Sequence, residues 1–230
     1  AIFSNPEDCK KIIRLLAKKH VGFTREEIAK ETGLPFGGGL TDTLNALVES
    51  DFIQRYRPYN ASGKVSFYKL IDNFSLFWLK YVEPNTEDIN FMTDNMTSNI
   101  MRVWRGVAFE EVCWQHIGQI KRALGISGVS SSISAWSVKG NDNKEGVQID
   151  LLIIRNDNVV NLCEMKFAGD IYTIDKEEDA KIRNRIQTLI NTLSPKQSVH
   201  LTMITTYGVS HTMYGGRVQQ QVILDDLFQS

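Results

Sequence analysis

The stretch that decides the fold runs from Val147 to Phe167 and reads VQIDLLIIRNDNVVNLCEMKF. It contains two runs rich in Val, Ile and Leu, at 147–154 and 159–167, separated by the polar residues 156–158. This pattern is typical of a strand, a turn and a second strand. The stretch therefore predicts a β-hairpin, and it sets acidic and basic side chains into strands that are otherwise apolar.

The register of this hairpin decides which polar side chains meet. Because side chains alternate between the two faces of a strand, Glu164 and Lys166 share one face. A three-residue loop at 156–158 would set Asp150 opposite Glu164, whereas a loop of two or four residues would set it opposite Cys163 on the other face. Three-residue loops usually need one residue in the left-handed region, which Asn tolerates better than most. The sequence favours the shared face and leaves the other register open.

Two carboxylates and an ammonium on one face have a chemical use. Neighbouring carboxylates repel each other in a mostly apolar sheet, so a hard divalent cation such as Mg²⁺ is a natural third party. An adjacent ammonium could then hold an attacking water or stabilise developing charge on a phosphate. The alternative is structural: Asp150 and Glu164 would lie at strand ends in solvent, with Lys166 as an ordinary ion-pair partner.

The motifs QID at 148–150 and EMK at 164–166, joined by a short hairpin, resemble the PD-(D/E)XK nuclease superfamily and its restriction-endonuclease-like fold. The resemblance implies that Asp150 and Glu164 bind the metal, Mg²⁺ or alternatively Mn²⁺, and that Lys166 assists the water. The surrounding chain more narrowly resembles the C-terminal region of a prokaryotic AAA-like, archaeal-type ATPase family. In that family a winged helix precedes the nuclease-like domain, and the likeness covers nearly all residues.

A further acidic residue is expected from the helix predicted over Trp104 to Leu124. Glu110 lies in its apolar stripe, and Glu111 lies off that line. An inward carboxylate needs a partner, because an unpaired buried charge is costly. The resemblance implies one, since the first helix of such nucleases often supplies a Glu to the metal, and Gly106-x-x-Phe109-Glu110 matches that pattern. The alternative is a salt bridge to a nearby Lys or Arg.

The first segment, residues 1–72, has the order helix, helix, helix, hairpin. These are the parts of a winged helix-turn-helix, in which Arg55, Arg57 and Lys64 would lie where a wing can touch DNA phosphates. The third helix weakens this interpretation, because residues 38–51 contain no Lys or Arg and carry three acidic residues. A protein–protein or inter-domain packing module is the alternative, and the third helix favours it.

The rest of the chain predicts a linker and a second domain. Residues 73–99 contain an aromatic segment, FSLFWLKY, which we expect to pack as a helix, followed by a polar connector. Residues 100–230 show the order helix, three strands, helix, two strands, which predicts a mixed sheet with helices on both faces. The long helix expected over 175–193 carries Lys181, Arg183 and Arg185 on its outer face, and Lys181 and Arg185 are candidate contacts to a DNA backbone.

The composition is that of an ordinary globular protein of 230 residues, with 42% hydrophobic and 23% charged residues and a net charge of −1. That length suits one large or two small domains. No apolar run approaches the length of a membrane span and no secretory signal is visible, so we expect a cytoplasmic protein without a membrane partner. The three cysteines, Cys9, Cys113 and Cys163, are far apart and lack metal-ligand spacing, which suits a reducing compartment.

The near-zero net charge gives no global case for nucleic-acid binding, so any DNA contact must depend on local patches. The sequence begins without Met and contains no GxxxxGK[ST] loop. The resemblance therefore implies an ATPase domain upstream in the same polypeptide. ATP would bind only there, outside this chain.

Together these observations predict an α/β protein with an N-terminal winged helix-turn-helix and a restriction-endonuclease-like α/β/α domain with a mixed sheet. The expected function is Mg²⁺-dependent cleavage of a DNA phosphodiester. Asp150 and Glu164 would hold the metal, Glu110 would complete its shell directly or through water, Lys166 would position the nucleophile, and Gln148 would orient that lysine or the substrate. The alternative is a non-catalytic DNA-docking or regulatory module of an ATP-binding protein.

Overall fold

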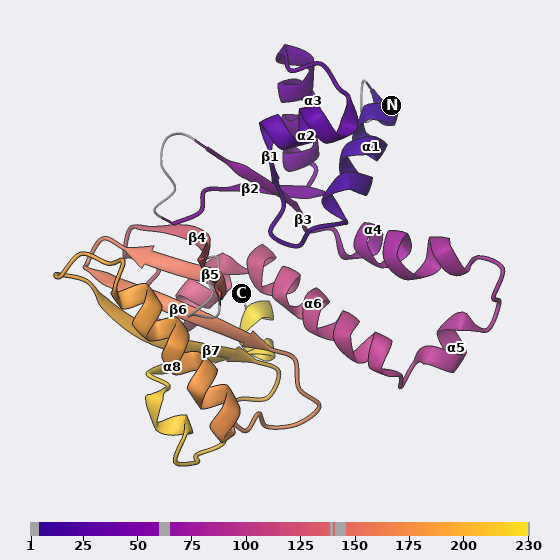
Figure 1. Cartoon of the computed structure of the whole chain (residues 1–230). Helices are drawn as coiled ribbons and strands as arrows, with labels where there is room; N and C mark the ends of the chain where they lie inside the picture. The colour runs from indigo at the N-terminus through magenta and orange to yellow at the C-terminus, as the bar shows by residue number, and fades with distance from the viewer. Residues whose placement is uncertain (1–4, 60–64, 139, 141–145, 230) are drawn as a thin grey trace. The chain divides into compact units, whose positions relative to one another are not determined.

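The chain folds into two compact units, residues 1–111 and residues 112–230, in a computed structural model (Figure 1). The structure describes residues 5–59, 65–138, 140 and 146–229. Each unit has its own sheet, of three strands in the first and five in the second. Among the described residues, no helix is both long enough and apolar enough to cross a bilayer.

The first unit begins with three helices and a hairpin, in the order that the sequence predicts. Its elements are α1 (Pro6–Leu16), β1 (Phe23–Thr24), α2 (Arg25–Thr32), α3 (Gly38–Glu49), β2 (Ile53–Tyr56) and β3 (Phe67–Leu70). Strand β3 lies in the middle of the sheet, and both its neighbours are antiparallel to it. The core is aliphatic, and its fully buried members include Ile12, Leu16, Ile28, Leu44, Leu47 and Ile53.

The helix ends of this unit follow local sequence signals. The Asn5 side chain accepts a hydrogen bond from the Asp8 backbone, and α1 begins at Pro6. Thr24 and Glu27 form a reciprocal capping box at the start of α2, with contacts of 3.1 Å and 2.7 Å. Gly33 ends α2 in the left-handed region with φ of 71°. These residue types satisfy the backbone groups that a helix end leaves unpaired, and they explain where α1 and α2 begin and where α2 ends.

The aromatic segment after the hairpin is helical, as predicted. It forms α4 (Asn73–Phe77) and continues as a π-helical turn, η1 (Trp78–Val82). The ring centroids of Phe77 and Tyr81 lie 5.2 Å and 5.9 Å from that of Trp104. Such aromatic pairs contribute about 0.5–1.5 kcal/mol beyond their burial, so this segment is anchored and is no free linker. The short elements η2 (Glu83–Asn85) and α5 (Phe91–Asn95) follow.

The helix predicted over Trp104 to Leu124 is two helices. Helix α6 spans Asn99–Gln115 and α7 spans Ile117–Ala123. His116 between them is not helical, with φ of −112° and ψ of 31°. The ring nitrogen Nδ1 of His116 lies 2.8 Å from the Val112 carbonyl oxygen. A side chain that bonds the backbone of its own preceding turn competes with the helix ladder, and an apolar repeat alone cannot reveal that competition. The boundary between the two compact units falls within α6.

The predicted inward stripe of α6 is also wrong in part. Glu111, expected off the stripe, is fully buried, whereas Val103, one turn before the predicted stripe position of Val107, is 52% exposed. In the first unit the contacts of α6 come from Trp104, from the Ala108 carbonyl and from Glu111. These three positions are spaced by four and three residues, so they form one face that is rotated by one residue from the predicted stripe. The position of the neighbouring elements, which spacing cannot supply, selects this face.

The second unit is a mixed sheet with the strand order β4-β5-β6-β7-β8. Its strands are β4 (Ser131–Val138), β5 (Val147–Arg155), β6 (Val159–Lys166), β7 (Ser198–Thr205) and β8 (Gln220–Ile223). The pairs β4/β5 and β5/β6 are antiparallel, and the pairs β6/β7 and β7/β8 are parallel. All five strands were expected from the sequence, so the mixed α/β class is confirmed.

Helices lie on both faces of this sheet. Helix α8 (Lys176–Ile190) covers the face that carries Glu164 and buries Ile182 and Leu189 (Figure 1). On the opposite face, Gln220 bonds both Asn161 and the carbonyl of Leu124, the residue that ends α7. The short 3-10 helices η3 (Gly215–Arg217) and η4 (Leu224–Phe228) flank β8.

The hairpin of β5 and β6 has the three-residue loop that the sequence favoured. Ile154 pairs with Val160, and Leu151 pairs with Cys163. Asn158 has φ of 67°, the left-handed conformation that such a loop needs. The paired residues end at Leu151, and the same register continued by one step would set Asp150 toward Glu164. The prediction of the register is therefore confirmed, and the competing pairing of Asp150 with Cys163 is excluded.

Candidate functional site

Glu164 is the most deeply buried acid of the second unit's candidate site. It lies near the end of β6 on the face covered by α8 and is 7% exposed. Burial raises the pKa of its carboxyl to about 7, although the positive charges of Arg185 and Lys166 oppose the rise. The negative charges of Glu178 and Asp150 add to it. The ionised form of a carboxylate in this setting is strongly stabilised by a nearby cation.

Lys166 lies two residues further along β6 and contacts acids from two elements. Its Nζ lies 2.8 Å from Glu178 Oε1 and 4.0 Å from Glu164 Oε2. Glu178 belongs to the first turn of α8, and the side chain of Asp175 accepts a hydrogen bond from its backbone nitrogen. The lysine is thus held between a strand residue and a helix residue that have fixed backbones.

The prediction that Arg185 lies on the outer face of α8 is wrong. Arg185 Nη1 lies 3.1 Å from Glu164 Oε2 and 3.9 Å from Glu178 Oε1, so the side chain points toward the sheet. The reason is helical spacing: Glu178 and Arg185 continue the inward stripe of Ile182 and Leu189 at intervals of four, three and four residues. That signal was present in the sequence. It was missed because the stripe was defined from apolar residues only.

The other basic residues of α8 do lie on its exposed side. Lys181 Nζ is 2.7 Å from Glu177, and Arg183 Nε is 3.0 Å from Asp179. Both are ion pairs across one helical turn. The pair of Lys181 with Glu177 is exposed and stabilises the helix only slightly, whereas Asp179 is buried and also contacts Arg217. Contact of Lys181 with DNA stays a prediction.

Asp150 and Gln148 occupy one face of β5, next to Glu164. Gln148 Nε2 donates to Asp150 Oδ1 at 2.6 Å. The amide therefore orients a carboxylate, whereas the sequence suggested that it would orient Lys166 or the substrate. The charge of Asp150 acts on the pKa of Glu164, which places the two acids within electrostatic range.

A groove of about 560 Å³ adjoins these side chains. Its walls come from the start of β5 and from one side of α8, and its lining residues are Gly146, Val147, Gln148, Glu177, Ala180, Lys181, Asn184 and Arg185. Gln148 and Arg185 thus belong to both the groove and the cluster of acids. The groove gives the cluster an opening through which a ligand could reach it.

Glu110, the fourth predicted catalytic residue, belongs to the first unit and contacts His20. His20 Nε2 lies 2.9 Å from Glu110 Oε2. Burial opposes the charged imidazole, but the hydrogen bond to Glu110 and the negative charges of Glu111 and Glu110 together raise the pKa of His20. A partner for Glu110 was expected, though as Lys or Arg and not His. Its membership in a metal shell stays a prediction.

The neighbouring Glu111 forms a second buried contact. Its Oε1 lies 2.9 Å from Lys69 Nζ and 3.4 Å from His20 Nδ1, and both Glu111 and Lys69 are almost inaccessible to solvent. Burial raises the pKa of Glu111, and the positive charges of Lys69 and His20 counter it. Neither His20 nor Lys69 was singled out from the sequence. Lys69 occurs in a strand where three successive residues, 68–70, are buried, so alternation alone would not identify it.

Two of the three basic residues that were predicted to contact phosphate from the wing lie in the described part of the chain. Arg55 lies on β2 with an exposed side chain, and Arg57 follows that strand and is exposed as well. Lys64 lies outside the described residues. Phosphate contact by these residues stays a prediction.

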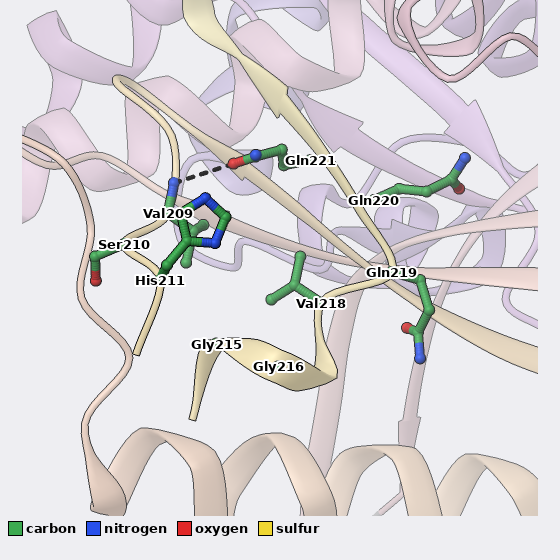
Figure 2. Close-up of a pocket in the computed structure, with 9 residues that line it drawn as sticks. All are labelled: Val209, Ser210, His211, Gly215, Gly216, Val218, Gln219, Gln220 and Gln221. Atoms are coloured by element: carbon green, nitrogen blue, oxygen red, sulfur yellow. Dashed lines mark hydrogen bonds between the residues drawn. The ribbon is translucent and has the colours of Figure 1, made fainter. Parts of the chain in front are cut away.

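A separate pocket of about 230 Å³ lies between β8 and the segment before it (Figure 2). Its glutamine side chains are used within the fold: Gln221 accepts from the Val209 backbone at 3.1 Å, as Figure 2 shows, and Gln219 accepts from the Leu201 backbone at 2.6 Å. Its described lining contains His211 but no carboxylate and no lysine. We therefore place the candidate site at the groove beside Glu164.

Comparisons with known proteins give few relatives. No family model matches the chain. An uncharacterized protein of Methanocaldococcus jannaschii is 27% identical over 171 residues, which cover 72% of this chain and 37% of that protein. The chain thus spans well under half the length of this relative. Human N-acetylserotonin methyltransferase in complex with SAM overlaps 87% of this chain and 54% of its own chain, with 11% identity and a TM-score of 0.24, a value too low to inform the fold.

Proposed function

We propose that the second unit hydrolyses DNA phosphodiester bonds with the help of a divalent cation, as its resemblance to PD-(D/E)XK nucleases implies. One observation carries the proposal. The three-residue loop fixes a register that pairs Leu151 with Cys163, and one further step would set Asp150 toward Glu164 and Lys166. Gln148, which bonds Asp150, and Arg185, which bonds Glu164, both line the adjoining groove. Glu164 and Lys166 share a face of β6 in any register, whereas a shift of one residue in the hairpin would move Asp150 to the other face.

The donor set fits Mg²⁺, with Mn²⁺ as the alternative ion. Asp150 and Glu164 offer hard carboxylate oxygens, and Glu164 is buried with a raised pKa and so gains most from a cation. Asp150 and Glu164, both in the second unit, would hold the ion. A bound ion would supply Lewis-acid activation of water and of the phosphate.

The remaining side chains have roles that follow from their contacts. Lys166 would hold the attacking water by a hydrogen bond and stabilise the negative charge that develops on the phosphate. Glu178, at 2.8 Å, keeps the ammonium in place on the side toward α8. Gln148 fixes one oxygen of Asp150, which leaves the other available to a ligand.

For the first unit we propose a winged helix-turn-helix. The order of three helices and a hairpin, with β1 completing the sheet, supports it. The absence of Lys and Arg from α3 limits DNA contact by this helix, so a packing role with protein partners is the alternative for this unit. The whole chain would then be the C-terminal region of an AAA-like ATPase-family protein, and the greater length of the M. jannaschii relative is compatible with an additional domain.

A second candidate, a non-catalytic docking module, also has an observation in its favour. Lys166 and Arg185 are both paired with acids, and the net charge of the chain is −1. A surface neutralised in this way attracts polynucleotides weakly. The fold would then serve binding to an ATPase or to DNA without chemistry.

Nicking of a supercoiled plasmid separates the two candidates. The wild-type chain should nick DNA in Mg²⁺ or Mn²⁺ and stop when EDTA is added, and Glu164→Gln should be inactive. The matched control is Asp225→Asn, which removes an exposed acid of the same unit that belongs neither to the groove nor to the proposed metal site. If wild-type protein with full metal occupancy, measured by calorimetry, leaves the plasmid supercoiled, the docking function replaces the nuclease.

A further inference from the structure

We propose that Arg185 exchanges partners, leaving Glu164 for a DNA phosphate in the adjoining groove when a divalent cation binds at Glu164. The inference rests on the proposed nuclease function and names the residue that couples metal binding to substrate binding. In this scheme Arg185 is the counter-ion of the acid cluster without metal and a substrate-binding residue with metal.

The first step is the position of Arg185 against Glu164. Its Nη1 lies 3.1 Å from Glu164 Oε2, the same carboxylate that would ligate the ion. A guanidinium at that distance and a divalent cation on the same carboxylate repel each other strongly, because the surroundings are poorly solvated. Metal binding therefore weakens the contact between Arg185 and Glu164.

The second step is the place to which the guanidinium can move. Arg185 already lines the groove, together with Gln148, Asn184 and Lys181. About a quarter of its side chain is exposed, so movement toward the groove does not require the core to open. A guanidinium binds phosphate with two parallel hydrogen bonds, a geometry that suits a DNA backbone.

The third step is the charge of the groove. Among its described lining residues the basic groups are Lys181 and Arg185, and Lys181 is paired with Glu177 at 2.7 Å. While Arg185 is paired with Glu164, both positive charges of the groove are neutralised. Metal binding would release one of them, so the groove becomes positive only when the site is loaded. This accounts for a substrate groove in a chain without excess positive charge.

Fluorescence anisotropy of a labelled DNA duplex, measured in EDTA and in Ca²⁺, tests the exchange. Ca²⁺ takes the same oxygen ligands as Mg²⁺ and is the probe ion. In the wild-type chain, Ca²⁺ should raise duplex affinity about tenfold, and Arg185→Met should lose most of that gain, since one charge-assisted contact is removed. Arg183→Met, which removes the same charge from a residue of α8 that does not line the groove, should keep the gain.

A second measurement distinguishes the exchange from a structural role of Arg185. Calorimetric titration with Mn²⁺ at pH 8, without DNA, should show tighter metal binding to Arg185→Met than to wild type, because a competing cation is gone. A merely destabilised site would bind the ion more weakly. Arg185→Lys, which keeps the charge but not the paired hydrogen bonds, should retain part of the Ca²⁺ gain and verifies that the position tolerates substitution.

The outcomes separate this inference from the nuclease proposal. If Arg185→Met keeps the full Ca²⁺ gain, or binds Mn²⁺ more weakly than wild type, the exchange is wrong while plasmid nicking by wild type still supports the nuclease. If wild type neither nicks plasmid nor binds duplex in Ca²⁺, both the nuclease and the exchange are wrong.

Discussion

The two units each contain a cluster of acids and bases, and the clusters differ in their access to solvent. In the first unit, Glu111 and Lys69 are sealed, with side-chain exposures of 0% and 4%. We call this pair, Lys69 and Glu111, the sealed cluster. In the second unit, Lys166 and Arg185 are 27% and 25% exposed, and Arg185 lines a groove. We call the set Asp150, Glu164, Lys166, Glu178 and Arg185 the groove cluster.

This difference shows why charge alone does not identify a functional site. A fully desolvated ion pair is fixed, since separating its members would leave an uncompensated charge in the interior. A half-buried cluster combines shifted pKa values with access for a ligand, which is the combination that catalytic sites need. Burial of the sealed cluster therefore predicts effects on stability, and burial of the groove cluster predicts effects on binding and chemistry.

The largest expected effect separates chemistry from metal binding in the groove cluster. Lys166→Ala should lower the rate of plasmid nicking by about two to four orders of magnitude, as expected for the loss of an electrostatic or proton-transfer group. Metal binding should remain largely intact, because the ammonium is not a ligand. Glu164→Gln should weaken both. Calorimetry with Mn²⁺, run beside the nicking assay, measures the two effects separately.

Two results would contradict this division of roles. Nicking by Lys166→Ala at the wild-type rate would remove the lysine from the mechanism. Loss of metal binding in the same variant, with its fold intact by circular dichroism, would mean that Lys166 organises the acids and does not act on the substrate.

The next effect concerns the sealed cluster. Lys69→Met leaves the buried carboxylate of Glu111 without its closest cation, and it should lower the free energy of unfolding by about 3–5 kcal/mol. Denaturant unfolding measures the change. Lys10→Met, which breaks the exposed pair with Glu7, is the matched control and should leave the free energy of unfolding close to that of the wild type.

A double variant sharpens this prediction. Lys69→Met combined with Glu111→Leu removes both charges and should recover much of the lost stability, because a buried apolar pair needs no counter-ion. If the double variant is as unstable as Lys69→Met alone, packing around Lys69, and not its charge, holds this part of the unit together.

Sequence reasoning recovered the elements whose signals are local. The capping box of Thr24 and Glu27, the strands of the second unit and the loop at Asn158 all depend on residues close together in the chain. The hairpin register followed from them, because a three-residue loop allows one pairing only.

Sequence reasoning failed where distant neighbours decide the outcome. The inward face of α6 depends on Trp104 meeting Phe77 and on Glu111 meeting Lys69, and neither contact has a local signal. The position of Arg185 could have been read from its spacing to Ile182 and Leu189, but only if a charged residue is admitted to an inward stripe. Charged residues join a buried stripe when another element supplies the counter-ion, as β6 does here with Glu164.

A further prediction concerns pH and tests whether Glu164 is as desolvated as its burial implies. Its pKa in the folded chain is raised from 4.5 to about 7, so between these values the folded state holds a proton that the unfolded state has lost. The stability contributed by this group is therefore complete below pH 4.5 and is lost as the pH rises through 7. The slope is at most about 1.4 kcal/mol per pH unit for one proton.

Denaturant unfolding of wild type and Glu164→Gln across this pH range isolates the contribution. Glu164→Gln has no titrating carboxyl at this position, so its free energy of unfolding should not show the decrease that Glu164 causes as the pH rises. The control Glu83→Gln removes an exposed acid whose pKa Arg14 lowers, so it should keep this decrease. Identical pH profiles for wild type and Glu164→Gln would show that Glu164 is ionised at ordinary pH and is solvated better than its position suggests.

The smallest expected effect tests the turn that assembles the groove cluster. Asn158 has φ of 67°, and Asp51 in the first unit has φ of 56°, so each unit has a non-glycine residue in the left-handed region. A β-branched residue there is strained, and Asn158→Val or Asp51→Val should each lower the free energy of unfolding by about 1–2 kcal/mol. Asn158→Gly, which adopts this conformation without strain, should retain most of the wild-type stability.

The two valine variants should differ in function. Asn158→Val favours loops of other lengths, and a shift of one residue moves Asp150 to the face of Cys163, so the affinity for Mn²⁺ should fall in calorimetry. Asp51→Val leaves the hairpin untouched and should bind Mn²⁺ as wild type does. Equal metal affinity in Asn158→Val and wild type would mean that the pairing of β5 with β6 is fixed by their apolar side chains, and that the turn follows the register instead of setting it.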